Sequence, residues 1–382
     1  MSDGRPSASA DDAPGAPVLW PLYLGGFLGP FGAAMLNTML PELAQGLNTS
    51  VTTAGSAVSA YLFPMAALMP LSGLLAARWG AARTVRRAFV LCALASIACA
   101  LAPTFHLFFA ARVAHGVGNA FTTPLLIAMI AERVPESRIG RSLGTYTSMQ
   151  AAGQAFAPFV GGLAAGVDYR LAFGVVAAVA FALAIASPSA RTAHDQSTRR
   201  PPLRPLLNLR LAEAGFVAFG VQFACTAVML LAALESSDRF GLSPGGRGLV
   251  VATFGVAGLV CGRLVGGIAD RIGMRRMGFG AVATLTVAVL AVAWAPTLGA
   301  LVACVVIAGV CATGGRVMTS TFALRSTPAN PNTATALALA AQFMGAAFAP
   351  GILPVYAHSV MLACVLAGSV AAIAALVTLV RR

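Results

Sequence analysis

The chain contains repeated apolar runs of about twenty residues in which apolar and polar positions do not alternate. In a bilayer every backbone amide and carbonyl needs an internal partner, so spanning segments are helices or closed barrels. A barrel strand alternates apolar and polar residues over about ten residues. The runs therefore predict transmembrane helices. Composition agrees, because 58% of the residues are hydrophobic and 10% are charged, more apolar surface than a soluble chain can bury.

We expect an all-α membrane protein with twelve transmembrane helices. Short polar separators divide the third span from the fourth and the eleventh from the twelfth. The expected spans are 18–40, 52–76, 85–103, 106–130, 142–166, 170–188, 211–234, 247–268, 277–295, 298–321, 333–355 and 358–380.

The formal net charge of +13 comes from arginine alone, since the chain has no lysine. The arginines form clusters between apolar runs, which indicates membrane topology and no nucleic-acid partner. If both termini are inside, only Arg170, Arg239 and Arg247 fall in outer segments. We therefore expect a multi-pass protein with both termini in the cytoplasm. The Ala-, Gly- and Arg-rich composition suggests a bacterium, and hence the cytoplasmic (inner) membrane.

No pattern for metal or covalent chemistry is present in the sequence. The seven cysteines lie in apolar runs without C-x-x-C or Cys/His spacing. There is no Ser/His/Asp order and no phosphate-binding glycine loop. We expect no enzyme activity, no metal and no cofactor.

The chain divides into two similar halves. Residues 1–16 read as a disordered cytoplasmic tail and 189–210 as a cytoplasmic linker, which leaves six-helix halves at 17–188 and 211–382. The segment 73–80 corresponds to 266–273, and 150–158 corresponds to 342–350, at offsets of 193 and 192. Gly116 falls on Gly309. Two such halves are the parallel-repeat architecture of secondary transporters.

Two loops carry a more specific resemblance. The segment Gly266-x-x-Ala-Asp270-Arg271-x-Gly273-x-Arg-Arg resembles the signature loop of the major facilitator superfamily. Its counterpart in the first half has Ala77 in place of the aspartate. The resemblance implies gating loops, whose contacts form in one access state and break in the other, and it places these contacts mainly at Asp270 in the second half. The alternative is that both loops are solvated and only set the membrane topology. The candidate gating residues are Gly73, Arg78, Gly80, Gly266, Asp270, Arg271 and Gly273.

Two motifs within the spans extend this resemblance. Arg112-x-x-x-Gly116-x-Gly118 is similar to the family's second motif. The fifth span is similar to the motif of the family's antiporters, and its small residues and proline favour close packing over a ligand role. The helix-five residues are Gly153, Pro158, Gly161 and Gly162.

Arg112 is the strongest candidate for a functional side chain. A charge within a span is costly and usually faces a cavity or a partner. It could bind an anionic group, tune a proton carrier, or extend to the outer surface. His115 and Asn119 continue the same helix face.

The remaining substrate or coupling candidates are polar residues in or near spans. Asn37-x-x-Leu-Pro resembles the end of helix one in drug:proton antiporters. Arg316 and Glu213 could form a pair, or each could anchor at headgroup depth. No acidic residue lies near the middle of a span, so His115 and Glu42 are the plausible proton carriers. The set is completed by Gln222.

Three functions remain open. The leading one is export of a small amphipathic or hydrophobic compound by a monomer that works by alternating access in the lipid bilayer, with or without protons. The second is uniport or exchange of a small anionic metabolite, with Arg112 and Arg316 as counter-charges. The third is a non-transporting membrane sensor or assembly protein, which the missing carrier acid and Ala77 favour.

Overall fold

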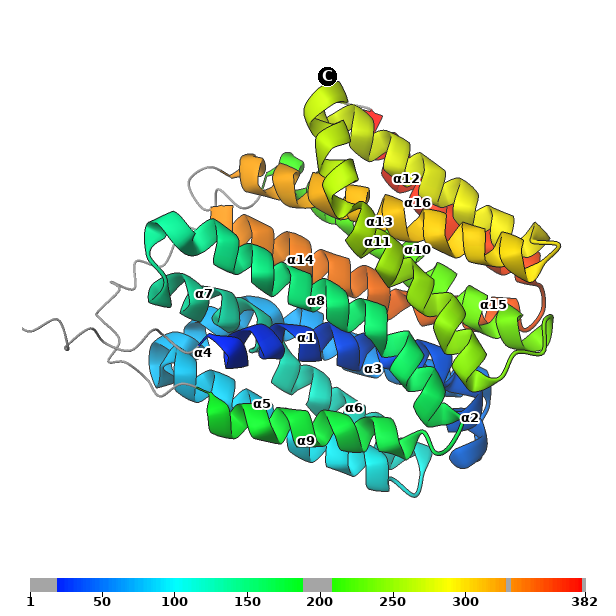
Figure 1. Cartoon of the computed structure of the whole chain (residues 1–382), viewed down its shortest axis with the longest axis horizontal. Coiled ribbons are helices and arrows are strands. Elements are labelled where there is room, and N and C mark those ends of the chain that lie inside the picture. Colours follow the sequence, from blue (N-terminus) through cyan, green and yellow to red (C-terminus); the bar gives the residue numbers. More distant parts are fainter. Residues whose placement is uncertain (1–18, 188–207, 328–330, 380–382) are drawn as a thin grey trace, which may run out of the picture.

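The computed structural model describes residues 19–187, 208–327 and 331–379. The expected tail 1–16 and residues 189–207 of the expected linker lie outside the described residues. The described part of the chain is helical throughout, with no strand (Figure 1). Leu209 and Arg210, expected in the linker, already belong to a helix whose N-cap is Asn208.

Six helical rods make up the first half. Several rods consist of consecutive helices joined by a 3-10 turn. In chain order they are α1 (Trp20–Ala34) with η1 (Met35–Thr38) and α2 (Leu40–Gly46); α3 (Val51–Leu68) with η2 (Met69–Leu71) and α4 (Ser72–Trp79); α5 (Ala81–Leu101); α6 (Phe105–Ala120) with α7 (Thr123–Arg133); α8 (Glu136–Ala165); and α9 (Arg170–Ala186).

Six further rods make up the second half. They are α10 (Leu209–Asp238); α11 (Pro244–Ile272); α12 (Met274–Ala291) with η4 (Val292–Trp294); α13 (Leu298–Ser326); α14 (Pro331–Phe348) with η5 (Ala349–Ile352) and α15 (Leu353–Tyr356); and α16 (Val360–Leu379).

Nine helices of the described residues are long and apolar enough to cross a membrane. The other three rods are α1 with its extension, the more polar α8, and α9, which is short at 17 residues. The expected spans coincide with these rods to within a few residues. Several helices continue beyond the apolar window, as α8 does by starting at Glu136, because charged residues such as Glu and Arg also form helices well. Hydropathy marks the lipid boundary and not the helix end.

The internal repeat appears as matched backbone contacts. A Cβ atom added to Gly116 would lie 2.0 Å from the carbonyl oxygen of Tyr61 on α3. A Cβ atom added to Gly309 would lie 2.0 Å from the carbonyl oxygen of Phe254 on α11. Both glycines and both partners are separated by the expected offset of 193. Each position therefore needs glycine for the same helix contact.

A second pair of contacts repeats in the same way. A Cβ atom at Gly153 would lie 2.2 Å from the carbonyl oxygen of Phe27, and one at Gly345 would lie 2.1 Å from that of Phe219. The offset is 192 for both members. The predicted pseudo-repeat of the two halves is thus confirmed at the level of backbone packing.

The two ends of the molecule differ in charge. We call the end that holds the α4–α5, α7–α8 and α11–α12 junctions the basic end, and the other the opposite end. Gly80 and Gly273 form the α4–α5 and α11–α12 junctions with φ of +82° and +89°, a conformation that favours glycine. In Figure 1 the first of these junctions lies at the left and the second at the top.

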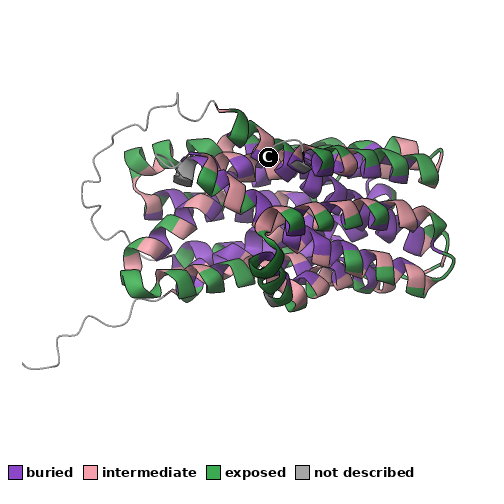
Figure 2. Ribbon diagram, turned by 90° about the horizontal axis from the view of Figure 1, so that it is seen from above, coloured by how far each residue is buried: buried purple, intermediate pink, exposed green. Residues whose placement is uncertain are grey.

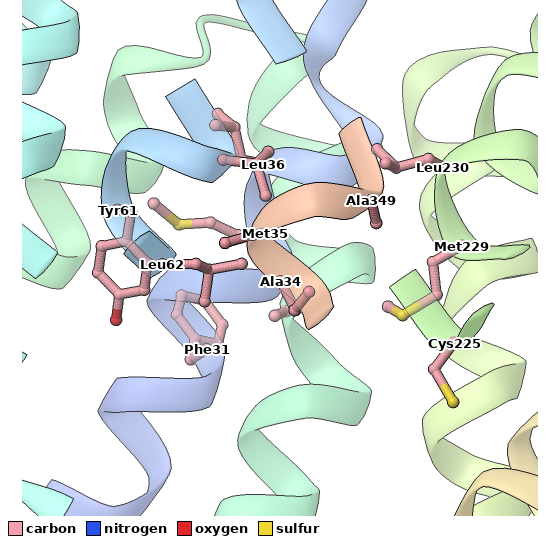
Figure 3. Packing of buried hydrophobic residues seen from close by; sticks show 14 of the residues in the cluster. Phe31, Ala34, Met35, Leu36, Tyr61, Leu62, Cys225, Met229, Leu230 and Ala349 are labelled. Carbon is pink, nitrogen blue, oxygen red and sulfur yellow. The ribbon is translucent and has the colours of Figure 1, made fainter. Parts of the chain in front are cut away.

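Apolar side chains from both halves pack together towards the opposite end. Met35 and Leu36 of η1 belong to the same buried cluster as Met229 and Leu230 of α10 and Ala349 of η5 (Figure 3). The outward faces carry exposed large apolar side chains, for example on α5, α11 and α16. Figure 2 shows this division, with buried residues inside and exposed residues along the outer helix faces and ends. Such a surface suits lipid.

Candidate functional site

An ion pair joins the two halves at the opposite end. A terminal nitrogen of Arg247, near the start of α11, donates to Oε1 of Glu42 on α2. The Arg247 side chain is buried, and its second terminal nitrogen donates to Oγ of Ser237 at 3.3 Å. Within the described residues, Oε2 of Glu42 and Nε of Arg247 are buried without a hydrogen-bond partner. Glu42, a candidate proton carrier, thus faces a positive charge across the interface.

Backbone contacts and one hydrogen bond reinforce this closure. Oγ of Ser59 on α3 donates to the carbonyl oxygen of Ala347 on α14 at 2.6 Å. A Cβ atom added to Gly162 on α8 would lie 2.9 Å from the Cα atom of Gly248 on α11. One added to Gly255 would lie 2.3 Å from the Cα atom of Ala155. α8 and α11 therefore meet backbone to backbone across the halves.

A cavity of about 280 Å³ lies between the halves. The first half lines it with α8 and the second with α11 and α13. Nη1 of Arg316 on α13 donates to Oε1 of Gln154 on α8 at 2.6 Å, so a hydrogen bond crosses the cavity wall from one half to the other. The lining residues are Thr147, Ser148, Ala151, Gln154, Gly255, Gly258, Leu259, Gly262, Thr313 and Arg316.

This cavity combines the polar side chains of α8 and α13 with three glycines of α11. Arg316 can donate to an anionic or polar acceptor, and Gln154 can both donate and accept. Concave sites with a few convergent polar groups are the usual form of small-molecule sites. The arrangement can orient a small solute that contacts both halves at once.

Arg112 lies in a packed cluster and does not line the cavity between the halves. Its side chain is fully buried. Nε donates to the carbonyl oxygen of Ala57 at 3.3 Å, and Nη1 donates to that of Gly32 at 3.2 Å. The guanidinium also lies over the ring of Tyr61, with 4.3 Å between its carbon and the ring centroid. It does not extend to the outer surface, and it connects α6 to α1 and α3.

Polar side chains continue the cluster along α6. Nδ2 of Asn119 donates to the hydroxyl of Tyr61, which donates to the carbonyl oxygen of Gly29 at 3.0 Å. Oγ1 of Thr122 donates to Oδ1 of Asn119 at 2.5 Å. The ring of His115 meets that of Tyr61 edge to face at 5.0 Å between centroids. The expected stripe Arg112, His115 and Asn119 therefore lies together, facing other helices of its own half.

Two atoms of this cluster lack a partner within the described residues. They are Nη2 of Arg112 and Nδ1 of His115, both buried. No ion pair to Arg112 occurs in the described part of the chain. A buried charge without a counter-charge is costly, and it is stabilised here by two carbonyl oxygens and an aromatic face.

The candidate gating residues lie at the basic end. Arg78, Asp270 and Arg271 are exposed, and within the described residues none of them makes a hydrogen bond or ion pair. A Cβ atom at Gly73 would meet nothing within 4 Å. Gly266 lies outside the described side chains. Within the described residues, the contacts expected of the gating loops are thus not formed in this conformation.

The helix-five motif packs on helix one and on the other half. A Cβ atom at Gly161 would lie 2.4 Å from the carbonyl oxygen of Met35, and Oγ1 of Thr38 donates to the carbonyl oxygen of Pro158 at 3.0 Å. Asn37 lies beside them in η1 and is buried, and its Oδ1 has no partner within the described residues. The motif holds the point where helix one changes to a 3-10 turn.

The remaining candidates are separated in space. Nε2 of Gln342 donates to Oε1 of Gln222 at 3.2 Å, which links α14 to α10 within the second half. Glu213 lines a different cavity, at the basic end, together with arginines of the second half. Arg316 and Glu213 therefore line different cavities, and Arg316 bonds to Gln154.

Comparison with known families decides the class. A family profile described as Major Facilitator Superfamily matches residues 22–350. The chain belongs to the major facilitator superfamily. It is a multi-pass membrane protein with the transporter fold of that family.

The curated relatives of this superfamily member carry the provisional name multidrug resistance protein MdtD. The protein from Serratia proteamaculans is 30% identical over 243 residues, which are 63% of this chain and 48% of the relative. The protein from Escherichia fergusonii is 28% identical over 251 residues, with the same shares of 63% and 48%. The chain thus matches about half the length of these relatives.

Solved major facilitator structures show the same fold. A mutant of the nucleoside transporter NupG superimposes with a TM-score of 0.77 at 14% identity, covering 95% of this chain and 99% of that one. A bacterial homologue of the human lysosomal transporter Spinster, inward-facing and unoccupied, gives a TM-score of 0.75 at 16% identity and covers 94% and 95% of the two chains.

Three interface and cluster residues were not among the expected site residues. Gln154 lies inside the helix-five motif, and its polar side chain among small residues could have marked it as a functional candidate. Tyr61 is a tyrosine within an apolar span, and a buried tyrosine hydroxyl usually needs a partner. Arg247 was assigned to an outer segment, and only the fold brings it to Glu42.

Proposed function

We propose that the chain exports a small amphipathic or hydrophobic compound by alternating access. The observation that carries this proposal is the cavity between the halves, where Arg316 and Gln154 meet at 2.6 Å. A solute there contacts both halves, so its binding can differ between their two arrangements. The names of the curated relatives, multidrug resistance proteins, support a drug-like substrate.

The proposal assigns the basic end to the cytoplasm, because arginine clusters mark cytoplasmic loops. The opposite end, where Glu42 meets Arg247 and Ser59 meets Ala347, then faces outward and is closed. The exposed Asp270, which makes no hydrogen bond or ion pair within the described residues, and the closed opposite end support an inward-open arrangement. Export requires the opposite end to open and the basic end to close around the solute.

Proton coupling, in this proposal, acts at Glu42. An ionised Glu42 attracts Arg247 across the halves, whereas a protonated Glu42 loses that attraction. Because Oε2 of Glu42 has no other partner within the described residues, the carboxylate has an oxygen that can accept the proton. Protonation from outside would weaken the closed opposite end. His115 is the second candidate carrier, but its ring is enclosed within its own half.

Arg316 supports a second candidate, uniport or exchange of a small anionic metabolite. It is the charged side chain that lines the cavity between the halves. Since arginine keeps its charge at all accessible pH values, it can serve as a permanent counter-charge. The charge of the substrate separates the two candidates.

The test is transport in proteoliposomes that contain the purified full chain. A panel of compounds extracted from cells that express the protein supplies the substrates, and a pH gradient is imposed or omitted. Wild type is compared with Glu42→Gln and with His115→Asn. We expect gradient-driven accumulation in wild type and uncoupled, gradient-insensitive movement in Glu42→Gln. If the wild-type protein transports the compound at the same rate with and without the pH gradient, the uniporter or exchanger is supported and the proton-coupled exporter is excluded. No movement of any compound would favour a non-transporting role.

A further inference from the structure

A second cavity, of about 370 Å³, lies at the basic end of the second half. It lies among α10, α12, α13 and α16, away from the cavity between the halves. Its charged lining consists of Arg210, Glu213, Arg275 and Arg325. The transport proposal does not use this cavity, and its lining needs a separate explanation.

The charge of this lining favours an anion. Three guanidinium groups and one carboxylate give a formal excess of two positive charges at one cavity. Nε of Arg275 donates to the carbonyl oxygen of Thr378 at 2.7 Å, which holds its guanidinium against α16. Thr378 and Ser326 add hydroxyl groups to the lining. Guanidinium groups match phosphate oxygens in pairs of hydrogen bonds.

The surroundings of the cavity favour an amphiphile over a free anion. Exposed leucines precede three of the lining residues: Leu209 is 59% exposed, Leu324 is 47% exposed and Leu376 is 58% exposed. Each adjoins a cavity residue in sequence, namely Arg210, Arg325 and Val377. The cavity therefore lies next to outward helix faces that carry apolar side chains, which could contact the acyl chains of a lipid whose head occupies the cavity. A free phosphate would use only the charged part.

We propose that this cavity binds the phosphodiester head of an anionic phospholipid. Basic cavities between helices on the cytoplasmic side are the type of site that holds such head groups. The bound head would connect the ends of α10, α12, α13 and α16. Glu213 weakens the attraction, because its carboxylate lines the same cavity as the three arginines.

The experiment is native mass spectrometry of the purified full chain in detergent, titrated with phosphatidylglycerol or phosphatidylcholine. We expect wild type to retain one phosphatidylglycerol at concentrations where phosphatidylcholine is lost. The variant Arg275→Gln with Arg325→Gln should weaken retention by about tenfold to thirtyfold, since each arginine near a lipid surface contributes on the order of one decade or less. The matched control, Arg83→Gln with Arg138→Gln, removes two exposed arginines from the basic end of the first half and should change retention by less than about twofold.

Further measurements keep the proposal open to refutation even if the double variant folds poorly. Glu213→Gln should strengthen retention of phosphatidylglycerol, a gain that misfolding cannot produce. Inorganic phosphate at millimolar concentration should leave the lipid in place. Equal weakening in the cavity variant and the control would overturn the proposal in favour of diffuse surface charge. Displacement by phosphate would overturn it in favour of a free-anion site, and no preference for phosphatidylglycerol in wild type would also overturn it.

Discussion

Glu42 and Arg247 form an ion pair across the two halves of the molecule, 205 residues apart in sequence. The pair adjoins the apolar cluster that includes Met35 and Leu230 at the same end. In the proposed alternating-access cycle the halves separate at this end, so the pair would have to break in each cycle. Its strength therefore sets how readily the opposite end opens.

Glu42→Gln should increase the population that is open at the opposite end. Removing one partner of a buried pair costs about 3–5 kcal/mol, and the partial exposure of Glu42, 21%, reduces this figure. The measurement is the distance between spin labels at Gln45→Cys and Leu249→Cys, with the half-exposed Cys261 and Cys304 replaced by serine. We expect the fraction of molecules with the longer distance between the labels to rise several-fold.

A charge exchange provides the control for this variant. Glu42→Arg combined with Arg247→Glu restores opposite charges in reversed order and should return the distances towards wild type. If Glu42→Gln leaves the distance distribution unchanged, the pair does not hold the halves together. A double-mutant cycle with Arg247→Gln isolates the interaction of the two side chains.

Gly116→Ala and Gly309→Ala should each destabilise the protein. The added methyl group would lie 2.0 Å from a backbone oxygen in both cases, and such overpacking costs about 1–3 kcal/mol or more. The midpoint of thermal unfolding in detergent checks this. Gly174→Ala is the matched control, because a Cβ atom there meets nothing within 4 Å. Similar losses in all three variants would show that the close contacts are not the cause.

Arg112→Gln should lower stability more than it alters substrate preference. The variant loses the hydrogen bonds to the carbonyl oxygens of Ala57 and Gly32 and the contact with Tyr61. Each buried group left unpaired costs about 1–3 kcal/mol. Thermal unfolding and the Km of transport, measured on the same preparation, separate the two effects. A large change in Km at unchanged stability would place Arg112 in the substrate path.

Arg316→Gln should distinguish the two proposed substrate classes. An anionic substrate would lose its counter-charge in the cavity, so its transport should fall by about two orders of magnitude, as for loss of a buried charged partner. A neutral compound should be slowed only several-fold, because Gln can still bond to Gln154. Initial rates in proteoliposomes measure both, and Arg316→Lys is the charge-conserving control. Equal effects on both substrates would assign Arg316 to the link between halves alone.

The sequence predicts the helical rods and the repeat well, for a physical reason. A membrane span requires about twenty consecutive apolar residues, and such a run can be recognised from neighbouring residues alone. The repeat is also local, since Gly116 and Gly309 carry the same contact at a fixed offset. The helix ends were less predictable because helix α8 continues into polar sequence as far as Glu136.

The candidate site was predictable only in part. Neighbours along one helix, such as Arg112, His115 and Asn119, follow from helical spacing. Partners across helices depend on the rotation of each helix, and uniformly apolar spans do not fix that rotation. For this reason the sequence did not show that Arg316 bonds to Gln154 of the first half, or that Glu213 lines a separate cavity of the second half. Arg112, which was expected to bind an anionic group, tune a proton carrier or extend to the outer surface, bonds to carbonyl groups of its own half, and those partners could not be read from the sequence.

The contact between α8 and α11 has a mechanical consequence. Where Gly162 meets Gly248 and Ala155 meets Gly255, the two backbones touch and neither glycine of α11 has room for a side chain, so the ridges that resist rotation between helices are low there. In the proposed cycle the two helices can turn against each other at this contact, while the ion pair, the Ser59 hydrogen bond and the shared apolar cluster resist the opening of the opposite end. A methyl group added at Gly248 would lie 2.5 Å from the carbonyl oxygen of Pro158, so it should obstruct that turning and slow the proposed cycle in a protein whose two halves each remain folded.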